Sequence, residues 1–212
     1  MTPNDQPTNA RGHYFDASPA TPSSRQTVEL ALPDLRLTLV TDRGVFSADR
    51  VDAGSKLLLL DGPPANPSDS VLLDIGAGYG PIACALARRN PQATVYAVEV
   101  NERARELCRE NAGANRLDNV IVVAPDDVPG DLAIDRIWSN PPIRVGKQAL
   151  HELLLRWLAH LAPGGSAHLV VQKHLGADSL ARWLDGQGYP TVRRSSRKAF
   201  RLLDVAPRTE LS

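Results

Sequence analysis

The sequence lacks the features that mark membrane, secreted and strongly charged proteins. No apolar run approaches the roughly 18 residues of a membrane-spanning helix, and the first 25 residues hold no apolar signal segment. The only two cysteines, Cys84 and Cys108, are not spaced as a CxxC pair, so neither a disulfide nor a metal site is expected. The 24 basic and 24 acidic residues cancel, so the net charge predicts no nucleic-acid partner. We therefore expect a soluble, cytoplasmic chain with reduced cysteines, folded as one domain with appendages.

The first third of the chain differs in composition from the rest. Residues 1–25 are rich in Pro, Thr, Ser and Asn and poor in large apolar residues, which predicts a flexible arm. The adjacent aromatics Tyr14 and Phe15 are the exception, since such a pair in a polar arm often docks on another surface. An apolar alternation over residues 27–40, broken at Pro33-Asp34, predicts a short antiparallel pair of strands. The predicted divisions are an arm at 1–25, an extension at 26–66, a main domain at 67–206 and a tail at 207–212.

After residue 67, short apolar runs alternate with segments of helical length. This rhythm predicts a parallel sheet with helices on both faces, because a parallel crossover needs a long connection. The last two strands have only a short link, so the last one is expected to be antiparallel. The predicted fold is α/β and Rossmann-like, with a mostly parallel seven-stranded sheet and no internal repeat. Strands are expected at 71–73, 94–98, 120–123, 134–138, 167–171, 191–194 and 199–205, and helices near 55–60 and at 82–89, 101–115, 150–161 and 177–184.

A glycine-rich loop follows the first of these strands. Gly76, Gly78 and Gly80 alternate with larger residues, so the backbone can turn tightly and approach a ligand closely. Glu99 ends the next strand, where a carboxylate can accept from both ribose hydroxyls. The spacing differs from the dinucleotide pattern G-x-G-x-x-G, and a carboxylate at the head of the loop, Asp74, suits an ammonium better than a pyrophosphate. The predicted ligand is therefore S-adenosylmethionine.

A second motif, Asn140-Pro141-Pro142, follows the strand expected at 134–138. Neither proline can continue a sheet, so the chain must leave it in a stiff turn with outward-facing carbonyls. An Asn side chain beside such carbonyls presents several hydrogen-bond acceptors to one small region. On its own the motif reads as a strand-ending turn. Beside a methyl-donor loop, it indicates a site for a group with two N–H donors, such as an exocyclic amine or a primary amide.

With these motifs the chain resembles class I S-adenosylmethionine-dependent methyltransferases. More narrowly, it is similar to the family that methylates guanine N2 in small-subunit ribosomal RNA, and the similarity runs from about His13 to Val205. Some family members carry a second, degenerate methyltransferase-like domain, and this chain is similar to the catalytic half alone. Ile143 stands where related enzymes often have Phe or Tyr. The segments that carry the resemblance are Thr41–Ser47, Asp52–Ser55, Asp74–Ile82, Val100–Ala104, Ser139–Lys147 and Val170–Lys173.

The resemblance implies a role for each residue of the cofactor site. The loop would wrap the methionine end, Asp74 would face its ammonium and Glu99 would hold the ribose. Asp126 or Asp127 would accept from the adenine amino group, although either could be a solvated turn residue. The implied cofactor-binding residues are Asp74, Gly76, Ala77, Gly78, Gly80, Glu99, Val100, Asp126, Asp127 and Asn140.

The implied catalytic residues are Asn140, Pro141 and Pro142. Asn140 and the Pro141 carbonyl would accept hydrogen bonds from the two N–H groups of the amine and aim the nitrogen lone pair along the S–CH₃ axis for an in-line displacement. No strong general base is required, so His151 and His174 are expected to be solvated surface residues. The expected substrate-binding residues are Phe46, Ile143, Arg144, Lys147, Lys173, Arg197 and Lys198.

Three functions remain open at this point. The first is methylation of guanine N2 in ribosomal RNA, with the RNA or the small ribosomal subunit as partner, no membrane or metal, and a monomeric enzyme. Five cations within residues 193–201 could follow phosphates, or could merely protect an edge strand. The second is methylation of a protein glutamine amide. The third is a cofactor-binding or RNA-binding module without turnover.

Overall fold

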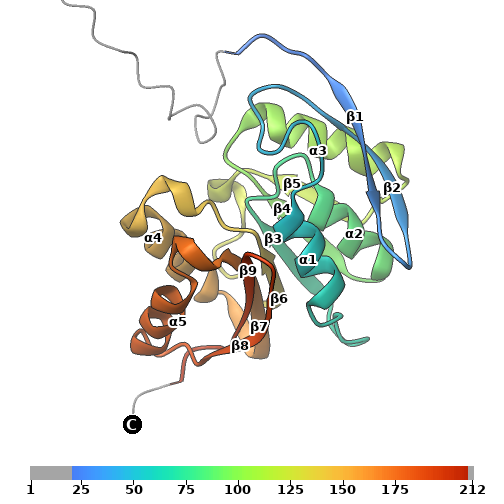
Figure 1. The fold of residues 1–212 in the computed structure, drawn as a ribbon. Helices are drawn as coiled ribbons and strands as arrows, with labels where there is room; N and C mark the ends of the chain where they lie inside the picture. Colours follow the sequence, from blue (N-terminus) through green and yellow to red (C-terminus); the bar gives the residue numbers. More distant parts are fainter. Residues whose placement is uncertain (1–20, 210–212) are drawn as a thin grey trace, which may run out of the picture.

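The computed structural model describes residues 21–209, with the exception of the Arg144 side chain, so Tyr14 and Phe15 lie outside it (Figure 1). The described chain forms one seven-stranded sheet and a separate two-stranded one. The strands are β1 (Gln26–Ala31), β2 (Arg36–Thr41), β3 (Val71–Ile75), β4 (Thr94–Val98), β5 (Val120–Val123), β6 (Ile134–Ser139), β7 (Leu161–Gln172), β8 (Thr191–Arg197) and β9 (Phe200–Val205). The α-helices are α1 (Ala53–Asp61), α2 (Pro81–Arg89), α3 (Glu102–Ala114), α4 (Lys147–Leu158) and α5 (Ala177–Gly186), and the 3-10 turns are η1 (Pro125–Asp127), η2 (Ile143–Val145) and η3 (Lys173–Leu175).

The large sheet has the strand order β5-β4-β3-β6-β7-β9-β8. Strands β5, β4, β3, β6 and β7 are parallel to one another, and β9 is antiparallel to both of its neighbours. This confirms the predicted mostly parallel sheet with an antiparallel last strand. The chain moves from β3 outward to β4 and β5 and then returns to β6 on the other side. A crevice for a ligand is therefore expected at the carboxyl ends of β3 and β6.

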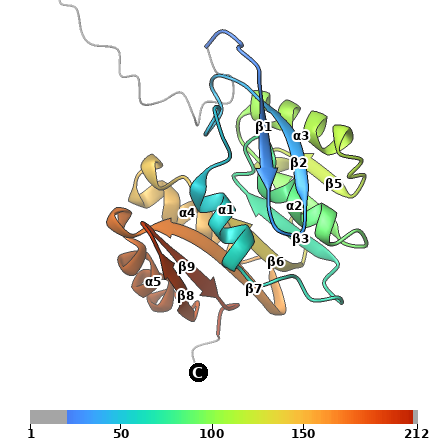
Figure 2. The same ribbon diagram turned by 45° about the vertical axis from the view of Figure 1, so that its right-hand side comes forward.

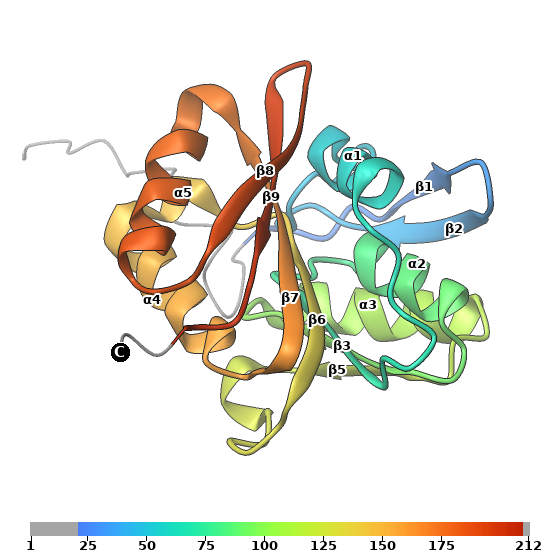
Figure 3. The same cartoon turned by 90° about the horizontal axis from the view of Figure 1, so that it is seen from below.

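Helices cover both faces of this sheet. Figure 3 shows α1, α2 and α3 on one side and α4 and α5 on the other. Each side has its own apolar core, and consecutive strand residues alternate between the two, as a pleated strand requires. Leu72 lies in the core under α2, whereas Leu73 lies in the core under α4.

The strands β1 and β2 form an antiparallel hairpin that packs over α3 and α2 (Figure 2). Its apolar side chains face inward, with Val28 opposite Leu39 and Leu30 opposite Leu37. Asn111 of α3 secures it: the buried amide accepts from Val40 N at 2.7 Å and donates to Val40 O at 2.8 Å. The predicted antiparallel pair is confirmed.

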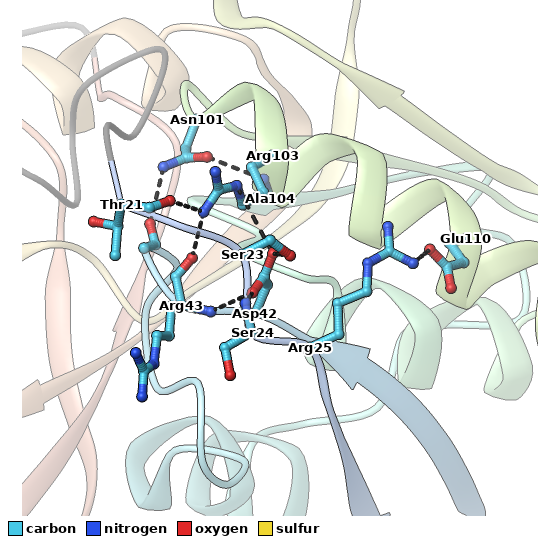
Figure 4. A network of polar contacts seen from close by, with 11 residues as sticks. Thr21, Ser23, Ser24, Arg25, Asp42, Arg43, Asn101, Arg103, Ala104 and Glu110 are labelled. Atoms are coloured by element: carbon cyan, nitrogen blue, oxygen red, sulfur yellow. Dashed lines mark hydrogen bonds and ion pairs between the residues drawn. The ribbon is translucent and has the colours of Figure 1, made fainter.

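The segment before β1 also contacts the rest of the fold (Figure 4). Asp42 accepts from the Ser23 hydroxyl at 2.7 Å, and Arg103 of α3 donates to the backbone oxygens of Thr21 and Arg43, each at 2.8 Å. Arg25 forms an ion pair with Glu110 of α3 at 2.9 Å. Residues 21–25, which we assigned to the flexible arm, are therefore held against α3.

Several predicted boundaries in the second half of the chain are wrong. The helix expected at 150–161 begins at Lys147 and ends at Leu158, and Leu161 already belongs to β7. Pro163-Gly164-Gly165, interpreted as a helix stop, lies inside β7 where its register with β6 shifts. A Cβ at Gly165 would lie 2.8 Å from Asp135 O, so this irregularity requires glycine.

Within residues 21–209, no helix has both the length and the apolar character needed to cross a membrane.

Candidate active site

The glycine loop lies at the carboxyl end of β3, at the predicted crevice. Gly76 N and Ala77 N both donate to Val98 O, at 2.9 and 3.1 Å, so the loop folds over the end of β4. Gly76, Gly78 and Gly80 all have positive φ, at 71°, 57° and 92°. A Cβ at Gly80 would lie 2.6 Å from Cys108 Sγ, whereas a Cβ at Gly78 would have no atom of the described residues within 4 Å. Gly80 therefore allows close packing of α2 on α3, and Gly78 faces open space.

Asp74 is completely buried at the end of β3. Its Oδ2 accepts from Ala83 N in the first turn of α2 at 2.9 Å, while Oδ1 has no hydrogen-bond partner among the described residues. Burial, together with the nearby charge of Glu99, raises the pKa of Asp74 to about 8. A buried carboxylate oxygen without a donor suits a cationic ligand group, such as an ammonium.

Glu99 directly follows β4, and both of its carboxylate oxygens are held in place. Oε2 accepts from Gly78 N and Oε1 accepts from Asn101 N, each at 2.9 Å. Each oxygen keeps a free lone pair, so the carboxylate can still accept from a pair of hydroxyls. Val100 beside it is exposed and offers an apolar surface.

The acidic turn η1 follows β5 and contains Asp126 and Asp127, both exposed. Arg156 of α4 donates to Asp126 Oδ1 at 3.0 Å and also to Pro125 O. Asp126 is therefore already engaged in an ion pair at the surface. The structure brings both acids to the same edge of the sheet as Glu99.

The motif Asn140-Pro141-Pro142 lies beside the glycine loop. Ser139 Oγ donates to Ile75 O at 2.8 Å and ties the ends of β6 and β3 together, and a Cβ at Gly76 would lie 4.0 Å from Pro142 Cδ. Pro142 has φ −74° and ψ 73°, and Ile143 N donates to Pro141 O at 2.8 Å, which is an inverse γ-turn. The Pro141 carbonyl is therefore already an acceptor, with one lone pair left for a ligand.

The Asn140 side chain has a fixed orientation. Its Nδ2 donates to Asp52 Oδ1 at 2.7 Å and to Ser55 Oγ at 3.1 Å, so both amide protons are used. The carbonyl Oδ1 then points away from these partners and remains an acceptor. Asp52 and Ser55 belong to a segment that carries the family resemblance, but no role was predicted for them.

Several residues predicted to bind substrate lie around the carboxyl edge of the large sheet. Phe46 is 54% exposed in the loop before α1, and Ile143 is half-buried in η2, which also contains Arg144. Lys147 begins α4 and Lys173 begins η3, both exposed, and neither forms an ion pair within residues 21–209.

The cationic run at residues 193–201 lies on β8 and β9. Three of its five cations are neutralised in ion pairs: Arg194 with Asp204, Arg197 with Asp61 and Arg201 with Asp178. Lys198 is exposed at the turn of the hairpin, where its φ is 49°. Most of this charge is therefore balanced by the protein itself.

The two histidines predicted to be non-catalytic lie in α4 and η3. His151 stacks on Trp183, with ring centroids 3.4 Å apart, and burial together with Lys147 lowers its pKa. His174 is exposed in η3.

Comparison with known proteins agrees with this geometry. The family model described as the methyltransferase small domain matches residues 36–192. The chain belongs to this methyltransferase family. The methyltransferase is 37% identical to the Bacillus subtilis protein YbxB, itself uncharacterised, over 82% of this chain and 87% of YbxB. It is 36% identical to ribosomal RNA small subunit methyltransferase C of Pseudomonas aeruginosa, over 85% of this chain and 59% of that protein.

A solved structure is also similar to the methyltransferase. It is the T. thermophilus 16S rRNA N2 methyltransferase in complex with AdoMet and guanosine, with a TM-score of 0.74 and 26% identity. The match covers 90% of this chain and 52% of the T. thermophilus chain. The methyltransferase thus spans little more than half the length of the P. aeruginosa and T. thermophilus rRNA methyltransferases. The family uses S-adenosylmethionine, as the loop spacing predicted.

Proposed function

We propose that the protein transfers a methyl group from S-adenosylmethionine to the exocyclic N2 amine of a guanine in small-subunit ribosomal RNA. The observation that carries this proposal is the orientation of Asn140. Its amide protons are both bound to Asp52 and Ser55, so the side chain presents only its carbonyl oxygen, an acceptor, to a ligand. An acceptor at this place selects a substrate atom that carries N–H bonds.

The residues at the carboxyl ends of β3, β4 and β5 fit the proposed cofactor. Asp74 Oδ1, buried and without a donor among residues 21–209, would receive the ammonium, and Glu99 would accept from the ribose hydroxyls. Asp127 is the better acceptor for the adenine amine, because Asp126 is paired with Arg156. When bound, S-adenosylmethionine supplies an activated methyl group on a sulfonium.

The protein's own contribution to the reaction is positioning. Asn140 Oδ1 and the free lone pair of Pro141 O would accept hydrogen bonds from the two N–H groups of the amine, which turns the nitrogen lone pair toward the methyl group. Fixing a reacting pair in this way can lower a barrier by about 7–11 kcal/mol in favourable cases. The methylated amine then loses its extra proton to water, so no basic side chain is needed.

Guanine is favoured over a glutamine amide by the named relatives. The P. aeruginosa protein is a ribosomal RNA small subunit methyltransferase, and the T. thermophilus enzyme was solved with guanosine. The exposed Phe46 would stack on the target base, since Ile143 cannot supply an aromatic face. Lys147 and Lys173 would contact RNA phosphates at the rim, and the protein would act as a monomer in the cytoplasm, where small subunits mature.

Radiolabelled S-adenosylmethionine, incubated with small ribosomal subunits that lack the modification, tests this proposal. We expect label in the RNA, recovered as N2-methylguanosine after digestion to nucleosides. Asn140→Ala should keep cofactor binding by calorimetry and lose most transfer. Label in ribosomal protein would instead indicate an amide substrate, and label in neither fraction would indicate a binding module without turnover.

A further inference from the structure

Asp52 links the start of α1 to the catalytic turn. A single oxygen, Oδ1, accepts from Gly54 N at 2.8 Å, from Ser55 N at 3.1 Å and from Asn140 Nδ2 at 2.7 Å. The first two bonds make Asp52 the N-cap of α1. The third reaches a residue 88 positions away, so this carboxylate does more than begin a helix.

The contact determines which way the Asn140 amide faces. Both amide protons have acceptors, Asp52 Oδ1 and the hydroxyl of Ser55, which is itself buried. If the amide rotated by half a turn, its carbonyl oxygen would face the Asp52 carboxylate, acceptor against acceptor. Such an arrangement loses a charge-assisted hydrogen bond and adds repulsion, so one orientation is strongly preferred.

The surrounding packing holds Asp52 in this position. A Cβ at Gly54 would lie 2.9 Å from Asp52 Oδ1 and 3.0 Å from Phe200 Cε1. Only glycine therefore allows the carboxylate and the Phe200 ring to approach α1 this closely. Helix α1, which Asp52 caps, packs on α2 and on β7, the neighbour of β6, so its position is fixed relative to the sheet.

We propose that Asp52, assisted by Ser55, is a positioning residue that keeps the Asn140 carbonyl turned toward the substrate amine. The inference rests on the proposed function, since it names what orients the acceptor of that reaction. It gives α1, which lies in the N-terminal extension, a direct role in the active site. It also makes Asp52 a determinant of specificity. If the Asn140 amide were turned the other way, it would present N–H donors and could not accept hydrogen bonds from a substrate amine.

A set of three variants separates this role from helix capping. Asp52→Ser keeps a good N-cap, but its hydroxyl is one bond shorter and falls short of Asn140. Asp52→Asn keeps a carbonyl oxygen that can accept from the same three donors. Ser55→Ala leaves the cap and removes the second acceptor alone. Each variant is compared with the wild type for melting temperature, cofactor affinity by calorimetry, and single-turnover methyl transfer to undermethylated small subunits.

We expect Asp52→Ser to lower the transfer rate by about 10- to 100-fold, because small misplacements of a positioning group have effects of that size. Its melting temperature and cofactor affinity should stay close to those of the wild type. Asp52→Asn should recover most of the rate, and Ser55→Ala should show a smaller loss. Full activity in Asp52→Ser would overturn the proposal, as would a loss that merely follows reduced folding or cofactor binding.

A second readout does not depend on the substrate. In ¹⁵N-labelled protein the two side-chain amide protons of Asn140, assigned by their loss in Asn140→Ala, should exchange slowly with solvent. Asp52→Ser should accelerate their exchange and shift them, and Asp52→Asn should do so much less. Unchanged amide signals in Asp52→Ser would refute the positioning role. If the wild type transfers no label to RNA, the proposed function fails, while this measurement still decides the role of Asp52.

Discussion

Glu99 acts electrostatically on Asp74 across the glycine loop. Glu99 accepts from Gly78 N within the loop, and Asp74 accepts from Ala83 N just beyond it. Burial and the charge of Glu99 together raise the pKa of Asp74 to about 8, so the free protein holds this carboxyl largely protonated at neutral pH. The proposed ammonium partner would reverse that preference.

Binding of S-adenosylmethionine should therefore release a proton from Asp74. An adjacent cation stabilises the carboxylate, so its pKa falls on binding and the affinity should rise with pH up to about 8. Calorimetry at pH 6.5 in buffers of different ionisation enthalpy measures the proton count directly. Asp74→Asn is the matched control, since it removes the proton released by Asp74 and keeps any proton released by the ligand. Equal proton release by the variant and the wild type would contradict this assignment.

The same group predicts how the stability of the free protein changes with pH. Because its folded pKa lies above the unfolded value of 3.8, the stability linked to Asp74 is fully present below that value and is lost as the pH rises through about 8. Asp74→Asn carries no such loss. Its melting temperature at pH 9 should therefore exceed that of the wild type by at least about 2–4 °C, the equivalent of ~1 kcal/mol. The gap should be smaller at pH 5. A gap independent of pH would show that Asp74 does not titrate in this range.

Two glycines of the loop should respond differently to alanine. Gly80→Ala should lower the free energy of unfolding by about 2–4 kcal/mol, because φ is 92° and the new methyl would overlap Cys108 Sγ. Gly78→Ala should cost only about 1 kcal/mol, from its φ of 57°, but should weaken cofactor binding because the methyl enters the open face of the loop. Urea unfolding and calorimetry separate the two effects. Adding Cys108→Ala to Gly80→Ala should restore part of the stability, and a failure to do so would place the strain elsewhere.

The rim lysines should account for more of the RNA affinity than the arginines of the β8–β9 hairpin. Lys147→Ala and Lys173→Ala each remove a cation that has no ion pair within residues 21–209, so each should reduce the salt dependence of RNA binding by about 0.7 in log–log slope. Arg194→Ala, whose side chain is paired with Asp204, serves as the control with little change. Filter binding at several salt concentrations gives the slopes. The opposite ranking would assign RNA contact to the hairpin.

The fold was predictable from sequence where local patterns determine structure. Gly76, Gly78 and Gly80 marked a strand-to-helix turn, and the alternation of strands and helices gave the parallel sheet. The prediction was wrong at Pro163-Gly164-Gly165, because these residues end a helix in most contexts but here form an irregularity inside β7. Only the pairing of β7 with β6, which is a tertiary contact, distinguishes a helix stop from an irregularity inside a strand.

The site was less predictable than the fold. Asn140 could be named from its prolines, but its orientation depends on Asp52, which local sequence does not connect to it. The pairing of Asp126 with Arg156 and of Arg197 with Asp61 likewise joins distant segments. Long-range polar contacts of this kind leave no periodic signal in the sequence.

The two cysteines under the glycine loop provide a built-in chemical reporter. Cys84 and Cys108 are buried where α2 meets α3, next to Gly80, and burial raises the pKa of both thiols. A thiol-modifying reagent can react with them only when α2 and α3 separate locally, so the labelling rate measures how often the loop region opens. A ligand seated on the loop should slow that labelling in proportion to its occupancy, which offers a way to rank cofactor analogues without RNA.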